Sequence, residues 1–527
     1  MPNVARAGAI MIAAQFLSRF LGLIRDSVAS GQFGRGMMTD AYNLSFSIPD
    51  ALFFLIAGGA LSSAFIPVFS EYLHTEREDD AWHVFSVMFT FMSLLLIGFI
   101  ALAWVYAYPL TYFFAPEVGA TERALITDMS RIVLPAQYAF FIGGLMFGTL
   151  YARQIFTVPG LGPNVYNIGI IVGALAISHF VTPPIAGMSW GALVGAFIGN
   201  LVIPFFVLRK IGVKFRPSLD LKHPGVRKVF RLMAPVVLGL SLPSVFALII
   251  QAFGTYYKSE GVNTALKYGN NLMQVPLGIF GQSLALAAFP ALSQFFVQSR
   301  MDMFSDQLAK TMRLAIYLSV PVAGLFLAMP EGVIRALFEH GQWTAADTAD
   351  TAMALRMFAI GIAAWCIQPI VMRAFFAVQK PVLPIVLGTI TTFVFLGGAY
   401  WVARMGGHFM WLALAGSGAA VLLAVLLLIA SRQVAPDLDL AGVGRTFVFS
   451  LGAMSIAGAL LYGGQYLVPP AGTVGGKLGG IAVVLVLALV YAWIYYFLTR
   501  AFKMPETKYL DNALARLRRR SEPTAEG

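Results

Sequence analysis

Long runs of apolar residues constrain the fold of this chain more than any other feature of its sequence. Runs of about 20 residues or more have the length that an α-helix needs to cross roughly 30 Å of hydrocarbon. They show no period-two alternation of apolar and polar residues, which excludes an outer-membrane β-barrel. Because 58% of the 527 residues are hydrophobic and only 12% are charged, a water-soluble enzyme is also excluded. We therefore predict an all-α polytopic membrane protein.

The apolar runs predict about fourteen transmembrane helices. Their expected ranges are 5–32, 40–70, 82–115, 124–152, 160–181, 187–208, 228–257, 264–296, 306–329, 349–378, 382–404, 408–431, 445–467 and 478–502. The first run is too long, and too interrupted by charged residues, to be a cleaved signal peptide. We interpret it as a retained span.

The basic residues gather on one side of the predicted spans. If the N-terminus is cytoplasmic, most of the 36 Lys and Arg residues fall in cytoplasmic segments, as the positive-inside rule requires. This predicts a multi-pass protein of the bacterial inner membrane with both termini in the cytoplasm. It also accounts for the net charge of +11 without a nucleic-acid partner. The basic tail around Lys508 and Arg516–Arg520 is interpreted as part of this bias, with binding to anionic lipid headgroups as the alternative.

Two parts of the chain repeat each other. Five residues of the second predicted span recur in the eighth at a constant offset of 223: Gly58, Leu61, Ala64, Pro67 and Ser70 recur as Gly281, Leu284, Ala287, Pro290 and Ser293. A second match relates Arg153-x-x-Phe156-x-Val158 to Arg373-x-x-Phe376-x-Val378 at an offset of 220. Both matches join even-numbered spans, so the repeats have the same orientation in the membrane.

The repeats predict a transporter body of two parallel six-helix lobes, followed by two additional helices. The expected parts are an N-terminal lobe (1–217), a C-terminal lobe that begins with a basic linker (218–440), the two additional helices (441–503) and a basic cytoplasmic tail (504–527). Substrate sites in such folds lie at the interface of the two halves.

Ionisable residues inside the spans are the candidate site, because a charge in hydrocarbon is costly unless it is paired or faces water. In the first span Ser18-Arg19 is followed seven residues on by Arg25-Asp26, so Arg19 and Asp26 share one face of the helix and Ser18 and Arg25 an adjacent face. Gly22 leaves room between them. Two arginine forks on adjacent faces suit a diphosphate. A structural pair, in which carboxylates neutralise the arginines, explains the pattern equally well.

Two further charged residues belong to the second and eighth spans. Asp40 follows Thr39 at the start of the second span, where it is either a helix N-cap or a second counter-charge to the arginines. Lys267, one turn before Asn271, is either a third cationic contact to the diphosphate or a side chain that extends to the outer headgroups.

Catalytic and metal-binding patterns are missing from the sequence. The six histidines have no ligand spacing, Cys366 is the single cysteine, and no glycine loop for phosphate binding is present. We therefore predict a transporter with no enzymatic activity, no metal, no cofactor and no ATP-driven step.

The motifs of the first two spans resemble those of the MurJ/MviN family, the lipid II flippases of peptidoglycan synthesis in the multidrug/oligosaccharidyl-lipid/polysaccharide exporter superfamily. The resemblance rests on SRFLGLIRD at 18–26, FGxGMxTDA at 33–41 and AFIPxxxEY at 64–72. It implies two lobes around a cationic cavity and a groove for the polyprenyl tail between the additional helices. It also implies that Arg19 and Arg25 bind the diphosphate, and that Asp26 and Asp40 are functional positions.

Three positions depart from the pattern of this family. Many relatives carry an arginine where this sequence has Phe53 and another where it has Asn271, and an acidic residue of relatives is Gln274 here. The resemblance thus implies a less cationic cavity, in which Lys267 restores one charge. The seventh span has no acidic residue, so the sodium site of some relatives is not expected.

We expect a flippase that moves lipid II from the inner to the outer leaflet by alternating access. Its expected partners are lipid II, membrane lipids and cell-wall synthesis proteins that the sequence does not identify. A flippase for another polyprenyl-diphosphate-linked glycan is the first alternative. A cation-coupled drug antiporter and a non-transporting membrane scaffold are the others.

Overall fold

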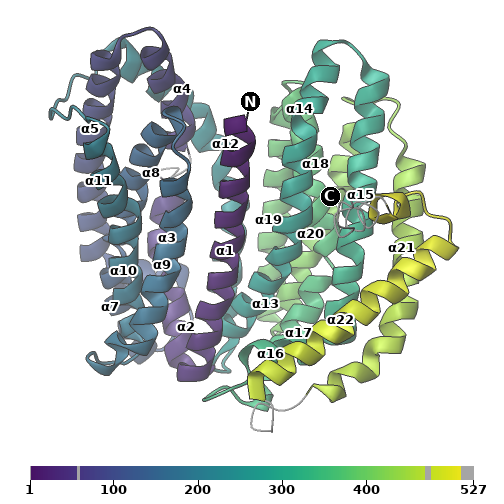
Figure 1. Cartoon of the computed structure of the whole chain (residues 1–527). Coiled ribbons are helices and arrows are strands. Elements are labelled where there is room, and N and C mark those ends of the chain that lie inside the picture. Colours follow the sequence, from purple (N-terminus) through teal and green to yellow (C-terminus); the bar gives the residue numbers. More distant parts are fainter. Residues whose placement is uncertain (1, 56–59, 469–475, 512–527) are drawn as a thin grey trace, which may run out of the picture. The chain divides into compact units, whose positions relative to one another are not determined.

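The computed structural model describes residues 2–55, 60–468 and 476–511 (Figure 1). All regular elements in these ranges are helices, which confirms the predicted all-α fold. Ten of the described helices are long and apolar enough to cross a membrane, and the bent pair α17 (Ala345–Ala359) and α18 (Ile362–Ala377) raises the number to as many as eleven. The predicted number of fourteen is therefore not confirmed.

Contacts divide the chain into two compact units. The first comprises residues up to Ala265 together with His340–Thr344, and the second comprises the rest. The helices of the first unit are α1 (Pro2–Phe33), α2 (Met37–Leu44), α3 (Ser47–Leu55), α4 (Ala60–His74), α5 (Glu78–Val105), α6 (Ala107–Phe114), α7 (Ala120–Val133), α8 (Ala136–Ala152), α9 (Thr157–Leu175), η1 (Ile177–His179), α10 (Ala186–Phe197), η2 (Ile198–Val202), α11 (Ile203–Lys210) and α12 (Pro224–Gly254).

Helix α13 (Val262–Pro276) begins in the first unit and continues into the second. The other helices of the second unit are η3 (Leu277–Gln282), α14 (Ser283–Val297), α15 (Met301–Ala328), α16 (Pro330–Phe338), α17, α18, α19 (Val382–Arg404), α20 (Met410–Ser431), α21 (Leu440–Leu461), η4 (Tyr462–Leu467) and α22 (Gly476–Ala501).

The predicted second span is not one continuous helix, since α2 ends at Leu44 and α3 begins at Ser47. Pro49 lies in the first turn of α3, where a helix does not need the N–H group that proline lacks. The predicted eighth span is one continuous helical run, Val262–Val297. Within it the π-helical η3 lies between α13, which ends at Pro276, and α14.

The order of helices in the first unit recurs in the second. Helices α4 and α14 begin and end 223 residues apart, and so do α5 and α15. Glu76 and Ser299, which adopt a left-handed backbone after α4 and α14, share this offset. It is the offset of the five-residue sequence match, whose Gly58 lies outside the described residues. The helix order therefore supports the predicted repeat.

The second sequence match, at an offset of 220, does not follow the register of the helices. Arg153 is the C-cap of α8, whereas Arg373 lies inside α18. The left-handed residues after these two helices, Gln154 and Gln379, are 225 residues apart. An offset of 225 therefore relates α8 to α18 and α9 to α19.

Helix α12 shows that repeat and packing divide the chain differently. Its residues Val226 and Val229 pack in one core with Phe65 and Phe69 of α4, so α12 belongs to the first unit. The predicted boundary between residues 217 and 218 follows the repeat, and it stays a prediction.

Helices α9 and α10 pack backbone against backbone in the first unit. A Cβ atom at Gly169 would lie 2.5 Å from the carbonyl oxygen of Gly191, and one at Gly187 would lie 2.7 Å from that of Gly173. Only glycine allows two membrane helices to approach this closely. The interface fixes α9, which carries part of the candidate site.

The two C-terminal helices α21 and α22 belong to the second unit, across which α22 lies obliquely (Figure 1). After α22, the buried carboxylate of Glu506 accepts hydrogen bonds from Arg313 Nε of α15 (2.6 Å) and Thr446 Oγ1 of α21 (3.0 Å). This ion pair fixes the end of the C-terminal helices to α15. The basic tail residues Arg516, Arg518, Arg519 and Arg520 lie outside the described residues.

Candidate functional site

Arg25 and Asp26 of α1 form an ion pair in the first unit. Arg25 donates from Nε and Nη2 to Asp26 Oδ1, at 2.9 and 2.7 Å. Asp26 is buried, and the side chain of Arg25 retains 21% of its exposure. The structure thus joins one of the two predicted arginines to the predicted counter-charge.

Helix α9 contacts this pair through Asn167. Its Oδ1 accepts a hydrogen bond from Arg25 Nη1 at 3.1 Å. Its Nδ2 donates to the carbonyl oxygen of Ser18 at 3.3 Å and to the Ser18 hydroxyl at 3.4 Å. The predicted residue Ser18 therefore belongs to the same cluster as Arg25, and Asn167 links them.

A second asparagine of α9 contacts only the backbone of α1. Asn164 Nδ2 donates to the carbonyl oxygen of Ala14 at 3.3 Å, one turn before Ser18. Sequence reasoning missed both Asn164 and Asn167. The available signal was two amide side chains three residues apart in an apolar run, since such groups often bond to neighbouring helices in a membrane.

Arg19 lies on the same face of α1 as Asp26, seven residues earlier, but its side chain is exposed, as are those of its neighbours Phe16 and Phe20. A Cβ atom at Gly22 would meet nothing within 4 Å, so the expected space beside the arginines is present. The structure shows Arg25 in a packed cluster and Arg19 on an open surface of the same helix.

Asp40 caps a helix other than its own. Helix α2 begins with a bond from Gly36 N to Thr39 Oγ1 (2.9 Å). The buried carboxylate of Asp40 instead accepts from the N–H and the hydroxyl of Thr264, both at 2.7 Å. Thr264 lies in the first turn of α13, where N–H groups lack partners within the helix. Sequence reasoning missed Thr264, which is 224 residues from Asp40.

The other positions of the predicted site have different surroundings. Lys267 and Asn271 are partly buried in the part of α13 that belongs to the second unit. Phe53, which replaces a family arginine, packs against Phe141 with ring centroids 5.2 Å apart. The role of Lys267 as a third cationic contact stays a prediction.

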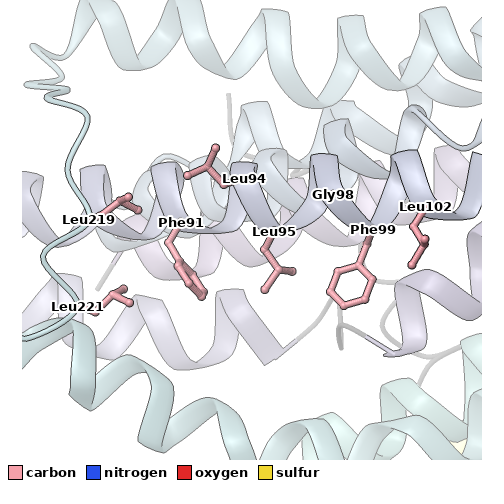
Figure 2. A pocket seen from close by; sticks show the side chains of 8 residues that line it. All are labelled: Phe91, Leu94, Leu95, Gly98, Phe99, Leu102, Leu219 and Leu221. Atoms are coloured by element: carbon pink, nitrogen blue, oxygen red, sulfur yellow. The ribbon is translucent and has the colours of Figure 1, made fainter.

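A cavity of about 540 Å³ lies along α5, and none of its lining residues belongs to this cluster (Figure 2). It is lined by Phe91, Leu94, Leu95, Gly98, Phe99, Leu102, Leu219 and Leu221. These side chains offer no charged or polar group to a diphosphate. The Arg25 cluster is therefore the better candidate for a site that binds a headgroup.

Comparisons with known proteins identify the family. The family model described as lipid II flippase MurJ matches residues 29–508. A lipid II flippase MurJ of Burkholderia cenocepacia is 26% identical over 474 residues, which cover 87% of this chain and 90% of that protein. A probable lipid II flippase MurJ of Buchnera aphidicola is 27% identical over 371 residues, which cover 70% of this chain and 72% of that protein.

Solved structures have a similar fold. A lipid II flippase MurJ in an inward closed conformation matches with a TM-score of 0.73 and 21% identity, over 93% of this chain and 99% of that one. An inward-facing multidrug resistance MATE family transporter of the MOP superfamily matches with a TM-score of 0.70 and 12% identity, over 83% and 99%. The family model covers most of the chain, and the chain therefore belongs to the MurJ family of lipid II flippases.

Proposed function

We propose that this protein moves lipid II from the inner to the outer leaflet of the bacterial inner membrane, for peptidoglycan synthesis, by alternating access. The family match over residues 29–508 carries this proposal. The arginine cluster on α1 supports it, because a lipid-linked diphosphate needs cationic hydrogen-bond donors inside the membrane. The protein is a transporter and not an enzyme.

Arg25 is the first proposed contact to the diphosphate. Its described hydrogen bonds to Asp26 and Asn167 use three of the five N–H groups of a guanidinium. Two N–H groups are left for phosphate oxygens. Asp26 keeps the empty site near neutrality, and its hold on Arg25 weakens when the more highly charged diphosphate arrives.

Arg19 is the second proposed contact, and its exposed position on α1 supports this role. Lys267 is a third proposed contact. Asp40 is proposed to act in gating, because its bonds to Thr264 join α2 to the first turn of α13 and would break if these helices separated.

The proposed topology places both termini in the cytoplasm, on the side of the basic segments. In this orientation lipid II is taken up from the leaflet in which it is made. Membrane lipids surround the protein, and cell-wall synthesis proteins are its proposed partners.

The proposed function is tested by depletion and rescue. The chain is expressed in a bacterium whose own lipid II flippase can be switched off, and lipid II in the outer leaflet is measured. We expect the wild type to restore lipid II export, and Arg25→Ala and Arg19→Ala to abolish it at equal membrane levels. Arg209→Ala, which changes an exposed arginine at the end of α11, is the control.

Failure of well-expressed wild type would contradict the proposal for lipid II. Export of another polyprenyl-diphosphate-linked glycan would then be measured in the same strain. Full export by both arginine variants would contradict the proposed diphosphate contacts and leave the transport function standing.

A further inference from the structure

We infer that Asn167 is a positioning residue for Arg25: its amide links the guanidinium to the backbone of α1 and holds it in the orientation that binds the diphosphate. This inference rests on the proposed function. It adds to that function a residue of a second helix, α9, that determines how the site is arranged.

The bonds of Arg25 divide into local and long-range ones. Asp26 is the adjacent residue of α1, so its bonds to Arg25 do not relate the guanidinium to any other helix. Among the hydrogen bonds of the described residues, the bond to Asn167 is the one that joins this guanidinium to another helix. The position of Arg25 relative to α9 therefore depends on Asn167.

The two ends of the Asn167 amide act together. The oxygen accepts from Arg25 while the nitrogen donates to Ser18, seven residues earlier on α1. Asn167 is 6% exposed, so water competes little for either end. Because the amide group is planar, fixing its nitrogen on Ser18 also fixes the direction from which its oxygen meets Arg25.

A fixed guanidinium binds a ligand better than a mobile one. A free arginine side chain samples many rotamers, and ordering it on binding costs conformational entropy. Asn167 removes part of this cost before the diphosphate arrives. Its backbone is in turn held by the glycine interface between α9 and α10, where Gly169 lies two residues further on.

Asn164 provides a matched control. Like Asn167 it is buried in α9 and donates to a carbonyl oxygen of α1, here that of Ala14. Its hydrogen bonds do not include Arg25. Replacing either asparagine by alanine therefore removes a bond between the same two helices, but only Asn167→Ala releases the guanidinium.

The experiment measures binding of lipid II to the full-length wild type, Asn167→Ala, Asn164→Ala and Asn167→Asp in nanodiscs, together with the thermal unfolding midpoint of each. We expect Asn167→Ala to bind lipid II about tenfold more weakly, as the loss of a hydrogen bond to a charged group predicts. Asn164→Ala should bind like the wild type while its unfolding midpoint falls by a similar amount.

Asn167→Asp keeps the shape of the side chain and the acceptor for Arg25 but adds a carboxylate. It should bind lipid II more weakly than the wild type, with the difference shrinking at high salt, because the added charge competes with the diphosphate. If Asn167→Ala does not accumulate, the high-salt measurement tests the inference: with the added charge screened, the weakening that remains reports the loss of the donor to Ser18, and binding equal to the wild type there would overturn the inference.

Equal binding by Asn167→Ala and Asn164→Ala would overturn the inference and leave Asn167 a structural residue. If the wild type itself does not bind lipid II, the proposed function fails and the inference fails with it. The two failures are thus distinguished by the wild type.

Discussion

Helices α9 and α19 hold the same position in the two repeats, but the polar side chains of α9 also bond to another helix. At the offset of 225, Asn164 and Asn167 of α9 correspond to Thr389 and Thr392 of α19. The threonine hydroxyls bond to carbonyl oxygens of their own helix, four residues back, at 2.9 and 2.8 Å. The asparagine amides also donate to carbonyl oxygens four residues back, but in addition they extend to α1. A hydroxyl can be satisfied within its own helix, whereas these amides join two helices.

Helices α9 and α19 also differ in how closely they pack against their neighbours. Gly169 of α9 lies against the backbone of α10, whereas the corresponding residue of α19 is Val394, which is 52% exposed. One repeat uses this helix to support a cluster of charges, and the other presents apolar surface. The comparison teaches that the two copies of a repeated helix can differ in what they support, through a few polar and small residues.

The largest expected effect comes from the glycine interface. Gly169→Leu should abolish folded protein, because even its Cβ would lie 2.5 Å from a backbone oxygen that cannot move without shifting α10. Val394→Leu should behave like the wild type. Size-exclusion profiles and thermal unfolding in detergent check both, and a folded Gly169→Leu protein would break the comparison.

A smaller effect is expected from removing the buried carboxylate of Glu506, which pairs with Arg313 in the second unit. Glu506→Ala leaves Arg313 without its buried partner and should lower the free energy of unfolding by about 3 kcal/mol. Asp306→Ala, which breaks the exposed pair with Lys310 on α15, should cost less than about 1 kcal/mol. Denaturation in mixed micelles measures both. Equal losses would show that burial does not distinguish the two pairs.

The two asparagines of α9 can be replaced by threonine, the residue at the corresponding positions of α19. The double variant Asn164→Thr with Asn167→Thr gives α9 the side chains of α19 and removes the amide bonds to α1. We expect a loss of about 1 kcal/mol of stability, since hydrogen bonds between membrane helices average about 0.6 kcal/mol. Unfolding measurements that find no loss would mean that these amides do not hold the two helices together.

The smallest effect is expected in α19. Thr389→Ala and Thr392→Ala remove hydroxyls that bond only within their own helix in the described contacts, so stability should change by less than about 0.5 kcal/mol. The same unfolding measurement applies. A loss as large as that of the asparagine variant would contradict the contrast between the two helices.

Much of the site followed from local geometry. Arg25 and Asp26 are adjacent, and the positions of Ser18 and Gly22 relative to them depend only on the helical repeat, so the sequence predicts how they lie on α1. For Asp40 the sequence left two roles open, a cap of its own span or a counter-charge to the arginines. The structure shows it as a cap of α13 instead, because Thr264 is 224 residues away and no local pattern relates the two.

The sequence by itself determined the membrane class, the helical fold, the family resemblance and the charged residues of α1, since these depend on apolar run length, on motifs and on spacing within one helix. Only the tertiary structure showed that Asn167 meets Arg25 across 142 residues, and that α12 packs with the first unit. Such contacts depend on how closely helices approach, as at Gly160 of α9, where a Cβ atom would lie 2.8 Å from the Cβ of Ala14 on α1. Periodicity shows which residues share a face of one helix, but it does not show which helix that face will meet.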